Sequence, residues 1–293
     1  MKYKTGSAFR RALEDRLRAT SLGTGLPLIR LRKLVAFDRL LARLHAVGPE
    51  AWVLKGGFAL QLRFGVRSRT TKDLDLMLLD PAAPVWDLLR QAASTDLRDW
   101  FSFEVGSPQL EPMEDQPEGQ RFPVRSLLDG RKFEGFHVDV GVGDPMIERP
   151  EILETADLLA FAGIDPVRFP TYPLSQQIAE KLHAYTRPHR GAEGTRVRDL
   201  VDILLIASLV SVDRSTLAAA IRSTFAVRST HALLAQVTGP PSSWASSFRK
   251  SARELGMKWD DLGAAFEAAQ VFLNPMLRED GPTKWDPATW TWI

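Results

Sequence analysis

The sequence predicts an α/β domain followed by an all-helical domain. Two observations indicate this fold class. Up to about residue 165, short apolar or alternating stretches typical of strands are mixed with stretches of helical periodicity. After Pro173, every periodic stretch is helical and none has the pattern of a strand. We therefore place a boundary near residues 165–172, with a first domain over residues 1–168 and a helical domain over residues 169–293.

Amphipathic periodicity predicts the helices, and short apolar runs bounded by turn residues predict the strands. In the first domain the predicted helices cover residues 8–20, 30–46, 58–63 and 84–94, and the predicted strands cover residues 51–54, 73–79 and 133–142. Residues 106–123 are rich in glycine and proline, which predicts a loop or the surroundings of a hairpin. In the second domain the predicted helices cover residues 174–186, 196–210, 214–226, 243–256 and 259–273.

The composition is that of a globular protein and excludes several kinds of chemistry. Of 293 residues, 44% are hydrophobic and 25% are charged. There is no cysteine, which excludes disulfides, thiolate metal sites and cysteine nucleophiles. The N-terminus has no apolar signal segment, and no run approaches the ~20 apolar residues of a membrane helix, so we expect a cytoplasmic protein without a membrane partner. With a net charge of only +2, a nucleic-acid partner must be bound by local basic patches.

A glycine pair and two aspartates form the most informative pattern. Gly56 and Gly57 stand between a predicted strand and a predicted helix, where backbone amides and the helix N-terminus favour a phosphate. Asp73 and Asp75 lie two apart on the next predicted strand, so their carboxylates share one face and are suited to bind Mg²⁺, with Mn²⁺ as a substitute. Each motif alone is common, and their order along the chain is what makes them specific.

Asp139 is the candidate for a third metal ligand. It lies between two valines on a predicted strand, where a carboxylate is costly to bury unless it is paired or bound to a metal. His137 shares its strand face and is expected to be structural, because metal-assisted transfer needs no histidine.

The run LKGGFALQLRFGVRSRTTKDLDL, which contains these motifs, resembles the AbiEii/AbiGii nucleotidyltransferase toxin family. That family includes the mycobacterial MenT toxins and belongs to the DNA polymerase β-like superfamily, so the resemblance implies a nucleotidyltransferase fold with a mixed sheet. The superfamily signature falls on Gly56, Gly57, Asp73 and Asp75. Residues 67–72 match a family segment before the acids, and the resemblance implies that Arg69, Thr71 and Lys72 help to bind the nucleotide.

A second resemblance covers residues 177–205, which are similar to the family's Glu-Lys helix and the basic-Asp-x-x-Asp helix after it. It implies a functional lysine at Lys181, on the nucleotide phosphates, and a functional acid at Asp199, with Asp202 as an additional candidate. From the residues alone, Lys181 is more typical of a lysine at the boundary of an apolar helix face. The alternative for the two acids is a salt bridge with Arg196 or Arg198. The basic residues of the intervening loop either contact an RNA backbone or are simply solvated; they are Arg187, His189, Arg190, Arg196 and Arg198.

The resemblance implies a magnesium-dependent nucleotidyltransferase, the toxin of a toxin–antitoxin pair, with its active site in a cleft completed by the helical domain. It would transfer nucleotides from a nucleoside triphosphate to the 3′ end of tRNA, release pyrophosphate, and so block aminoacylation and translation. A separate antitoxin protein is the implied partner. The open alternatives are transfer of AMP to a protein, and a catalytically silent relative that binds RNA or a partner. A phosphate on Thr70 or Thr71 would lie beside the metal acids and inactivate the enzyme.

Overall fold

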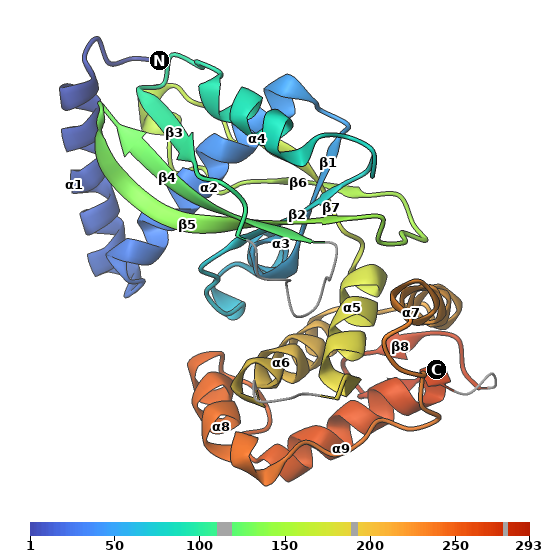
Figure 1. Cartoon of the computed structure of the whole chain (residues 1–293). Coiled ribbons are helices and arrows are strands. Elements are labelled where there is room, and N and C mark those ends of the chain that lie inside the picture. Colours follow the sequence, from blue (N-terminus) through green and yellow to red (C-terminus); the bar gives the residue numbers. More distant parts are fainter. Residues whose placement is uncertain (110–118, 189–192, 278–280) are drawn as a thin grey trace. The chain divides into compact units, whose positions relative to one another are not determined.

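The computed structural model describes residues 1–109, 119–188, 193–277 and 281–293 (Figure 1). The chain forms two compact units, each assembled from more than one segment. Unit 1 comprises Met1–Arg63, Thr70–Gly143 and Pro150–Thr171, and unit 2 comprises Phe64–Arg69, Asp144–Arg149 and Tyr172–Ile293. In the described part of the chain, no helix combines the length and the apolar character that crossing a membrane requires.

Unit 1 is built on one seven-stranded sheet with the strand order β3-β4-β5-β2-β1-β7-β6 (Figure 1). The strands are β1 Trp52–Lys55, β2 Leu74–Leu78, β3 Phe101–Val105, β4 Gln120–Leu128, β5 Arg131–Val142, β6 Glu151–Glu154 and β7 Arg168–Thr171. β2 pairs antiparallel with β1 and parallel with β5, so the sheet is mixed, as expected. This pairing puts the strand that carries Asp75 at the centre of the sheet.

The helices of unit 1 begin and end at residues suited to those positions. They are α1 Gly6–Thr24, α2 Leu28–Val47, α3 Gly56–Phe64 and α4 Val85–Ser94, with short 3-10 turns at Gly65–Arg67 and Ala160–Ala162. The Thr5 side chain accepts a hydrogen bond from the backbone N–H of Ala8, and Gly25 ends α1 in the left-handed conformation with φ 72°. Phe37 of α2 packs edge-on against Phe58 of α3 and Phe136 of β5, in a continuous apolar core.

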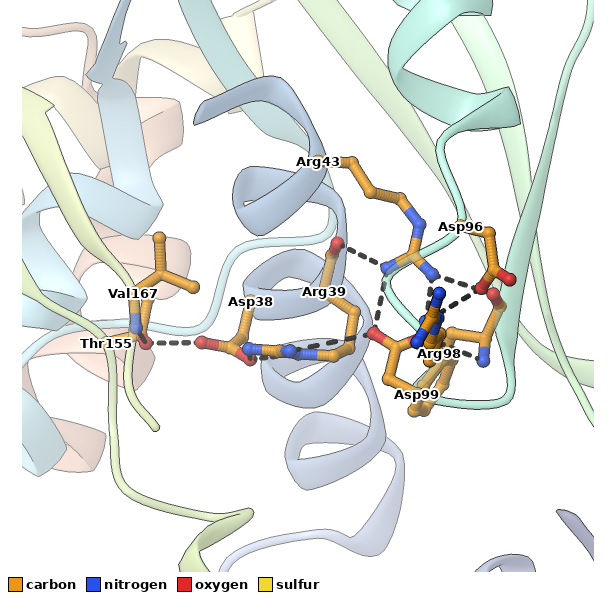
Figure 2. A network of polar contacts seen from close by, with 9 residues as sticks. Asp38, Arg39, Arg43, Asp96, Arg98, Asp99, Thr155 and Val167 are labelled. Atoms are coloured by element: carbon orange, nitrogen blue, oxygen red, sulfur yellow. Dashed lines mark hydrogen bonds and ion pairs between the residues drawn. The ribbon is translucent and has the colours of Figure 1, made fainter. Parts of the chain in front are cut away.

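A buried ionic network in unit 1 is centred on α2 (Figure 2). Asp38 accepts hydrogen bonds from Arg39 Nε at 2.6 Å and from the hydroxyl of Thr155, just after β6. Arg39 also lies 3.6 Å from Asp99, which precedes β3. Arg43 donates two hydrogen bonds to Asp99, at 2.7 and 3.0 Å. Because β3 and β6 are the two edge strands, the network ties α2 to both edges of the sheet.

Unit 2 is a group of helices completed by a small hairpin (Figure 1). The helices are α5 Leu174–Thr186, α6 Glu193–Leu209, α7 Arg214–Arg228, α8 Ala245–Glu254 and α9 Leu262–Leu273, with 3-10 turns at Ser242–Trp244 and Asn274–Leu277, and the hairpin strands are β8 Trp285–Asp286 and β9 Thr291–Trp292. The indole N–H groups of Trp285, Trp290 and Trp292 donate to backbone carbonyls of α6 and α9, which pins the C-terminal segment onto these helices.

The structure contains strands that the sequence analysis did not predict. β3 has the alternating pattern Phe-Ser-Phe-Glu-Val, for which no strand was predicted, and the first four residues of β4 lie within the loop predicted at 106–123. Pro123 is tolerated inside β4 because pairing with β3 ends at Val124, so its missing N–H interrupts no ladder on that side. β6 and β7 have only 4 residues each, and β7 lies within the expected boundary at 165–172. Residues 110–118 lie outside the described residues.

Candidate functional site

The turn between β1 and α3 requires its first glycine. Gly56 has a φ of 65°, a conformation that side-chain-bearing residues rarely adopt. A Cβ atom at this position would lie 2.0 Å from Oδ2 of Asp75, so only a glycine allows the Asp75 carboxylate to approach the turn. Gly57 follows as a buried residue in the first turn of α3. The glycine motif and the aspartate motif, far apart in sequence, therefore meet at one point.

A row of charged residues crosses four neighbouring strands at that point. Lys55 of β1 is the register partner of Asp75 of β2, Asp75 is the partner of Asp139 of β5, and Asp139 is the partner of Arg121 of β4. Register partners point to the same face of a sheet. Two acids therefore lie side by side on this face, flanked by a cation on each outer strand.

Asp73 belongs to the same face. Its Oδ1 lies 3.3 Å from Nδ1 of His137, and its Oδ2 lies 3.9 Å from a guanidinium nitrogen of Arg121. His137 and Asp139 are two apart on β5 and so share the face that Asp75 occupies. The structure therefore brings Asp73, Asp75 and Asp139 to one face. The Asp73 side chain remains 33% exposed, and Asp75 is also partly exposed.

Asp139 is occupied by an ion pair in this structure. Arg121 Nε donates to Oδ1 at 2.7 Å, and Nη2 donates to Oδ2 at 2.6 Å, which is a bidentate arrangement. The hydrogen bonds to Asp139 and the nearby Asp73 and Asp75 raise the pKa of Arg121. The cost of burying Asp139 is thus offset by an arginine.

The acids available fit a small hard cation. Asp73 and Asp75 offer partly exposed carboxylate oxygens, the donors that Mg²⁺ prefers, and Mg²⁺ is commonly held by one or two carboxylates together with substrate phosphates. Among the residues that the structure describes, no group of three or more His, Cys, Asp or Glu side chains is arranged to hold a metal. The donor set therefore suits Mg²⁺ shared with a nucleotide rather than a metal fully enclosed by protein.

Unit 2 contains a second, buried charge cluster on α5 and α6. Asp202 has no exposed side-chain surface; it accepts a bidentate pair of hydrogen bonds from Arg69 and lies 2.6 Å from Nζ of Lys181. Asp199 lies 3.5 Å from the same Nζ and 3.4 Å from Arg196, and its side chain is 13% exposed. Asp202 therefore fixes two cations, while Asp199 contacts Lys181 from a slightly more exposed position.

The charges of this cluster depend on one another. Burial by itself lowers the pKa of Lys181, but the attraction of Asp202 and Asp199 outweighs it and the pKa is raised. Burial likewise raises the pKa of Asp202 by itself, but Arg69 and Lys181 outweigh it and hold the pKa below its ordinary value. Lys181 is therefore a cation at neutral pH despite its burial.

This coupling predicts a stability that depends on pH. The pKa of Asp202 is lower in the folded protein than in the unfolded chain. The ionised carboxylate therefore contributes fully to the free energy of unfolding above the ordinary aspartate pKa of about 3.9, and this contribution is lost as the pH falls through the pKa of the folded state. We expect Asp202→Asn to lower the free energy of unfolding by about 2 kcal/mol at neutral pH. Urea unfolding should show this difference narrowing as the pH is lowered towards about 3. Asp260→Asn, which removes one partner of an exposed ion pair, is the control. If the difference in unfolding free energy between the wild type and Asp202→Asn does not change with pH, the prediction is wrong.

Two further predicted residues, Thr71 and Lys72, directly precede Asp73 in the chain. The Thr71 hydroxyl donates to the carbonyl oxygen of Asp73 at 3.0 Å. The Lys72 side chain is exposed, and its carbonyl accepts a hydrogen bond from Lys33 Nζ at 3.3 Å. Arg69 is engaged with Asp202 as described, so its part in nucleotide binding stays a prediction. His189 and Arg190 of the basic loop lie outside the described residues.

Three residues of the site were missed or set aside in the sequence analysis. Lys55 is buried beside the glycine turn, Arg121 pairs with Asp139, and His137 contacts Asp73. The alternation of Arg121, Phe122, Pro123 and Val124 was a signal for the strand that carries Arg121, but the surrounding prolines concealed it. Strand register, which the sequence alone does not give, is what places these cations next to the acids.

A family model described as "Nucleotidyl transferase AbiEii toxin, Type IV TA system" matches residues 39–287, most of the chain. The chain belongs to this family. It is thus a nucleotidyltransferase toxin of the AbiEii type, from a type IV toxin–antitoxin system, which confirms the resemblance seen in the sequence. No curated protein matches the chain in sequence.

Solved structures show the same fold. MenT4, a nucleotidyltransferase toxin from Mycobacterium tuberculosis, is similar with a TM-score of 0.56 and 19% identity, over 94% of this chain and 92% of that chain. This likeness confirms the predicted α/β fold followed by helices, and at this identity it shows the fold alone. JHP933 from Helicobacter pylori has a TM-score of 0.40 and 18% identity, over 76% of this chain and 89% of that chain.

Proposed function

We propose that this AbiEii-type toxin transfers nucleoside monophosphates from a nucleoside triphosphate to the 3′ end of tRNA, and that the blocked tRNA no longer accepts an amino acid, which stops translation. The observation that supports the chemistry is the meeting of Asp75 with the Gly56 turn, beside Asp73. Phosphate-binding backbone and metal-binding carboxylates at one point are what nucleotidyl transfer needs. The tRNA acceptor rests on the family resemblance.

In the proposed reaction, the acceptor hydroxyl oxygen attacks the α-phosphorus of the nucleotide. A new P–O bond forms, the bond to the β-phosphate oxygen breaks, pyrophosphate leaves, and the hydroxyl proton passes to solvent. Asp73 and Asp75 would hold Mg²⁺, which when bound neutralises phosphate charge and makes the hydroxyl more acidic. The backbone at Gly56 and Gly57 would bind the triphosphate.

We assign the residues of unit 2 to the same reaction. Lys181 is a cation at neutral pH and would stabilise charge that develops on the phosphates. Asp199 would orient Lys181 through their 3.5 Å contact, while Asp202 holds Lys181 and Arg69 in place. In this assignment, residues 1–168 form the catalytic domain and residues 169–293 complete the active site. An antitoxin protein encoded with the toxin would neutralise it.

One experiment tests the proposal against its alternatives. The protein is incubated with Mg²⁺, total RNA, total protein extract and each nucleoside triphosphate labelled at the α-phosphate. We expect label on RNA of tRNA size and none from γ-labelled nucleotide, because the β- and γ-phosphates leave as pyrophosphate. Label on protein would instead indicate AMP transfer to a side chain. Absence of label from every nucleotide would indicate a silent binding relative and would refute the proposal.

The position of Thr71 predicts an inhibitory effect of negative charge. Its hydroxyl contacts the backbone of Asp73, so a charged group there would lie beside the metal acids and compete with the triphosphate. We expect Thr71→Glu to slow nucleotide transfer at least about tenfold in the labelling assay. Thr71→Gln, of similar size and uncharged, should retain most of the activity. Full activity of Thr71→Glu would rule out such control at this residue.

A further inference from the structure

Arg121 belongs to the charged row on the sheet, and the proposed reaction gives it no role. It is held by two short hydrogen bonds to Asp139, at 2.7 and 2.6 Å. These bonds engage both oxygens of a carboxylate whose side chain is only 7% exposed. Bidentate arginine–carboxylate pairs are among the strongest ionic contacts in proteins, so this pair is a built feature of the site.

The same guanidinium reaches the neighbouring metal acid. Arg121 Nη2 lies 3.9 Å from Oδ2 of Asp73, on the face of the sheet that carries Asp73, Asp75 and Asp139. One positive charge therefore cancels one of the three negative charges at the point where a cation is expected to bind. The electrostatic attraction for a metal ion depends on the net negative charge that remains on this face.

Asp139 would have to give up this pair to bind a metal. Separation of the pair would leave a buried carboxylate to be satisfied by the metal alone, and the guanidinium would remain close by as a repelling charge. Mg²⁺ loses its water reluctantly and is commonly bound by only one or two carboxylates. The geometry therefore favours retention of the ion pair when the site is loaded.

We propose that Arg121 is a positioning residue that keeps Asp139 out of the metal coordination, so that the site is limited to the two carboxylates of Asp73 and Asp75 and its affinity for divalent cations is moderated. This inference rests on the proposed metal site. It assigns the third acid of the face to an ion pair, and it explains why a buried aspartate between two valines carries an arginine on the adjacent strand.

The test measures binding of Mn²⁺ alone, without nucleotide, by electron paramagnetic resonance. Arg121→Gln removes the repelling cation and frees Asp139, so we expect it to bind Mn²⁺ about tenfold more tightly than the wild type. Asp139→Asn leaves the cation uncompensated and should bind several-fold more weakly. The double variant Arg121→Gln/Asp139→Asn removes both charges and should return to roughly the wild-type affinity.

Arg125→Gln is the matched control. Arg125 lies on the same strand, and its side chain is 60% exposed in an ion pair with Glu104, so its loss should leave Mn²⁺ affinity unchanged. Thermal melts of each variant establish that it is folded. If Arg121→Gln does not fold, the comparison of Asp139→Asn with the double variant carries the test alone.

The outcomes separate the inference from the proposed metal site. If Asp139 is a ligand, the double variant stays as weak as Asp139→Asn, and the inference is wrong. An affinity of Arg121→Gln equal to that of the wild type also overturns it. In both cases the metal site stands, provided that Asp75→Asn abolishes Mn²⁺ binding. If Mn²⁺ binding does not depend on Asp75, the proposed metal site and the inference both fail.

Discussion

Replacement of Asp75 by asparagine should lower the rate of nucleotide transfer roughly a thousandfold and leave the fold intact, which corresponds to about 4 kcal/mol of lost transition-state stabilisation. Asp75 is the acid that faces the Gly56 turn, where the proposed triphosphate and metal meet. Asparagine keeps the shape of the side chain and removes the negative charge, so a loss of activity would show that the reaction requires this charge. Incorporation of α-labelled nucleotide into RNA measures the effect.

The control for this variant lies just beyond the other end of the same strand. Asp80 is exposed and accepts a hydrogen bond from the backbone N–H of Ala82, a contact that asparagine can also make. Asp80→Asn should therefore retain nearly full activity. Equal melting temperatures of the wild type and Asp75→Asn would show that the loss is catalytic. A transfer rate of Asp75→Asn within about threefold of the wild type would remove the central acid from the proposed mechanism.

Replacement of Asp99 by asparagine should destabilise unit 1 by about 3–5 kcal/mol, because it leaves a buried positive charge without its partner. Arg43 is fully buried, and both of its hydrogen bonds to a carboxylate go to Asp99 (Figure 2). Asp99 also accepts a hydrogen bond from the backbone N–H of Phe101, at the start of β3, at 3.0 Å. Loss of its charge should therefore loosen the attachment of α2 to that edge of the sheet. Urea unfolding monitored by tryptophan fluorescence measures the change.

The same loop offers a matched control. Asp96 is exposed and accepts a hydrogen bond from the backbone N–H of Arg98, so Asp96→Asn should change stability by less than about 0.5 kcal/mol. A second substitution, Arg43→Met, in the Asp99→Asn background should recover part of the lost stability because it removes the unpaired charge. If Asp99→Asn has the same free energy of unfolding as the wild type, the ionic network does not stabilise unit 1.

Much of the site could be predicted from the sequence because its motifs are local. The order of strand, glycine pair, short helix and Asp-x-Asp strand depends on residues close together in the chain, and the structure has β1, α3 and β2 where the pattern predicts them. The one-face placement of Asp73 and Asp75 follows from the period of two of any strand. The helices of unit 2 followed in the same way from their periodicity, within a few residues at each end.

The strands at the edges of the sheet could not be predicted with the same success. β6 and β7 are too short for a clear period. β4 contains a proline, which is typical of a turn. Only the strand pairing shows that β3 ends before this proline, so that it is tolerated in the sheet. Their existence depends on pairing with distant strands. Local propensity is a weak guide where hydrogen-bond partners come from elsewhere in the chain.

The sequence by itself therefore determined the fold class, the glycine turn and the pair of acids beside it, because short-range spacing specifies all three. Only the tertiary structure decided which charges meet: Arg121 with Asp139, Arg69 and Lys181 with Asp202, and α2 with both edges of the sheet. Strand register and helix packing, which depend on the whole chain, bring these residues together. The decisive instance is Asp139, which the pattern left open as a metal ligand or an ion-paired acid and which the structure pairs with an arginine on the adjacent strand.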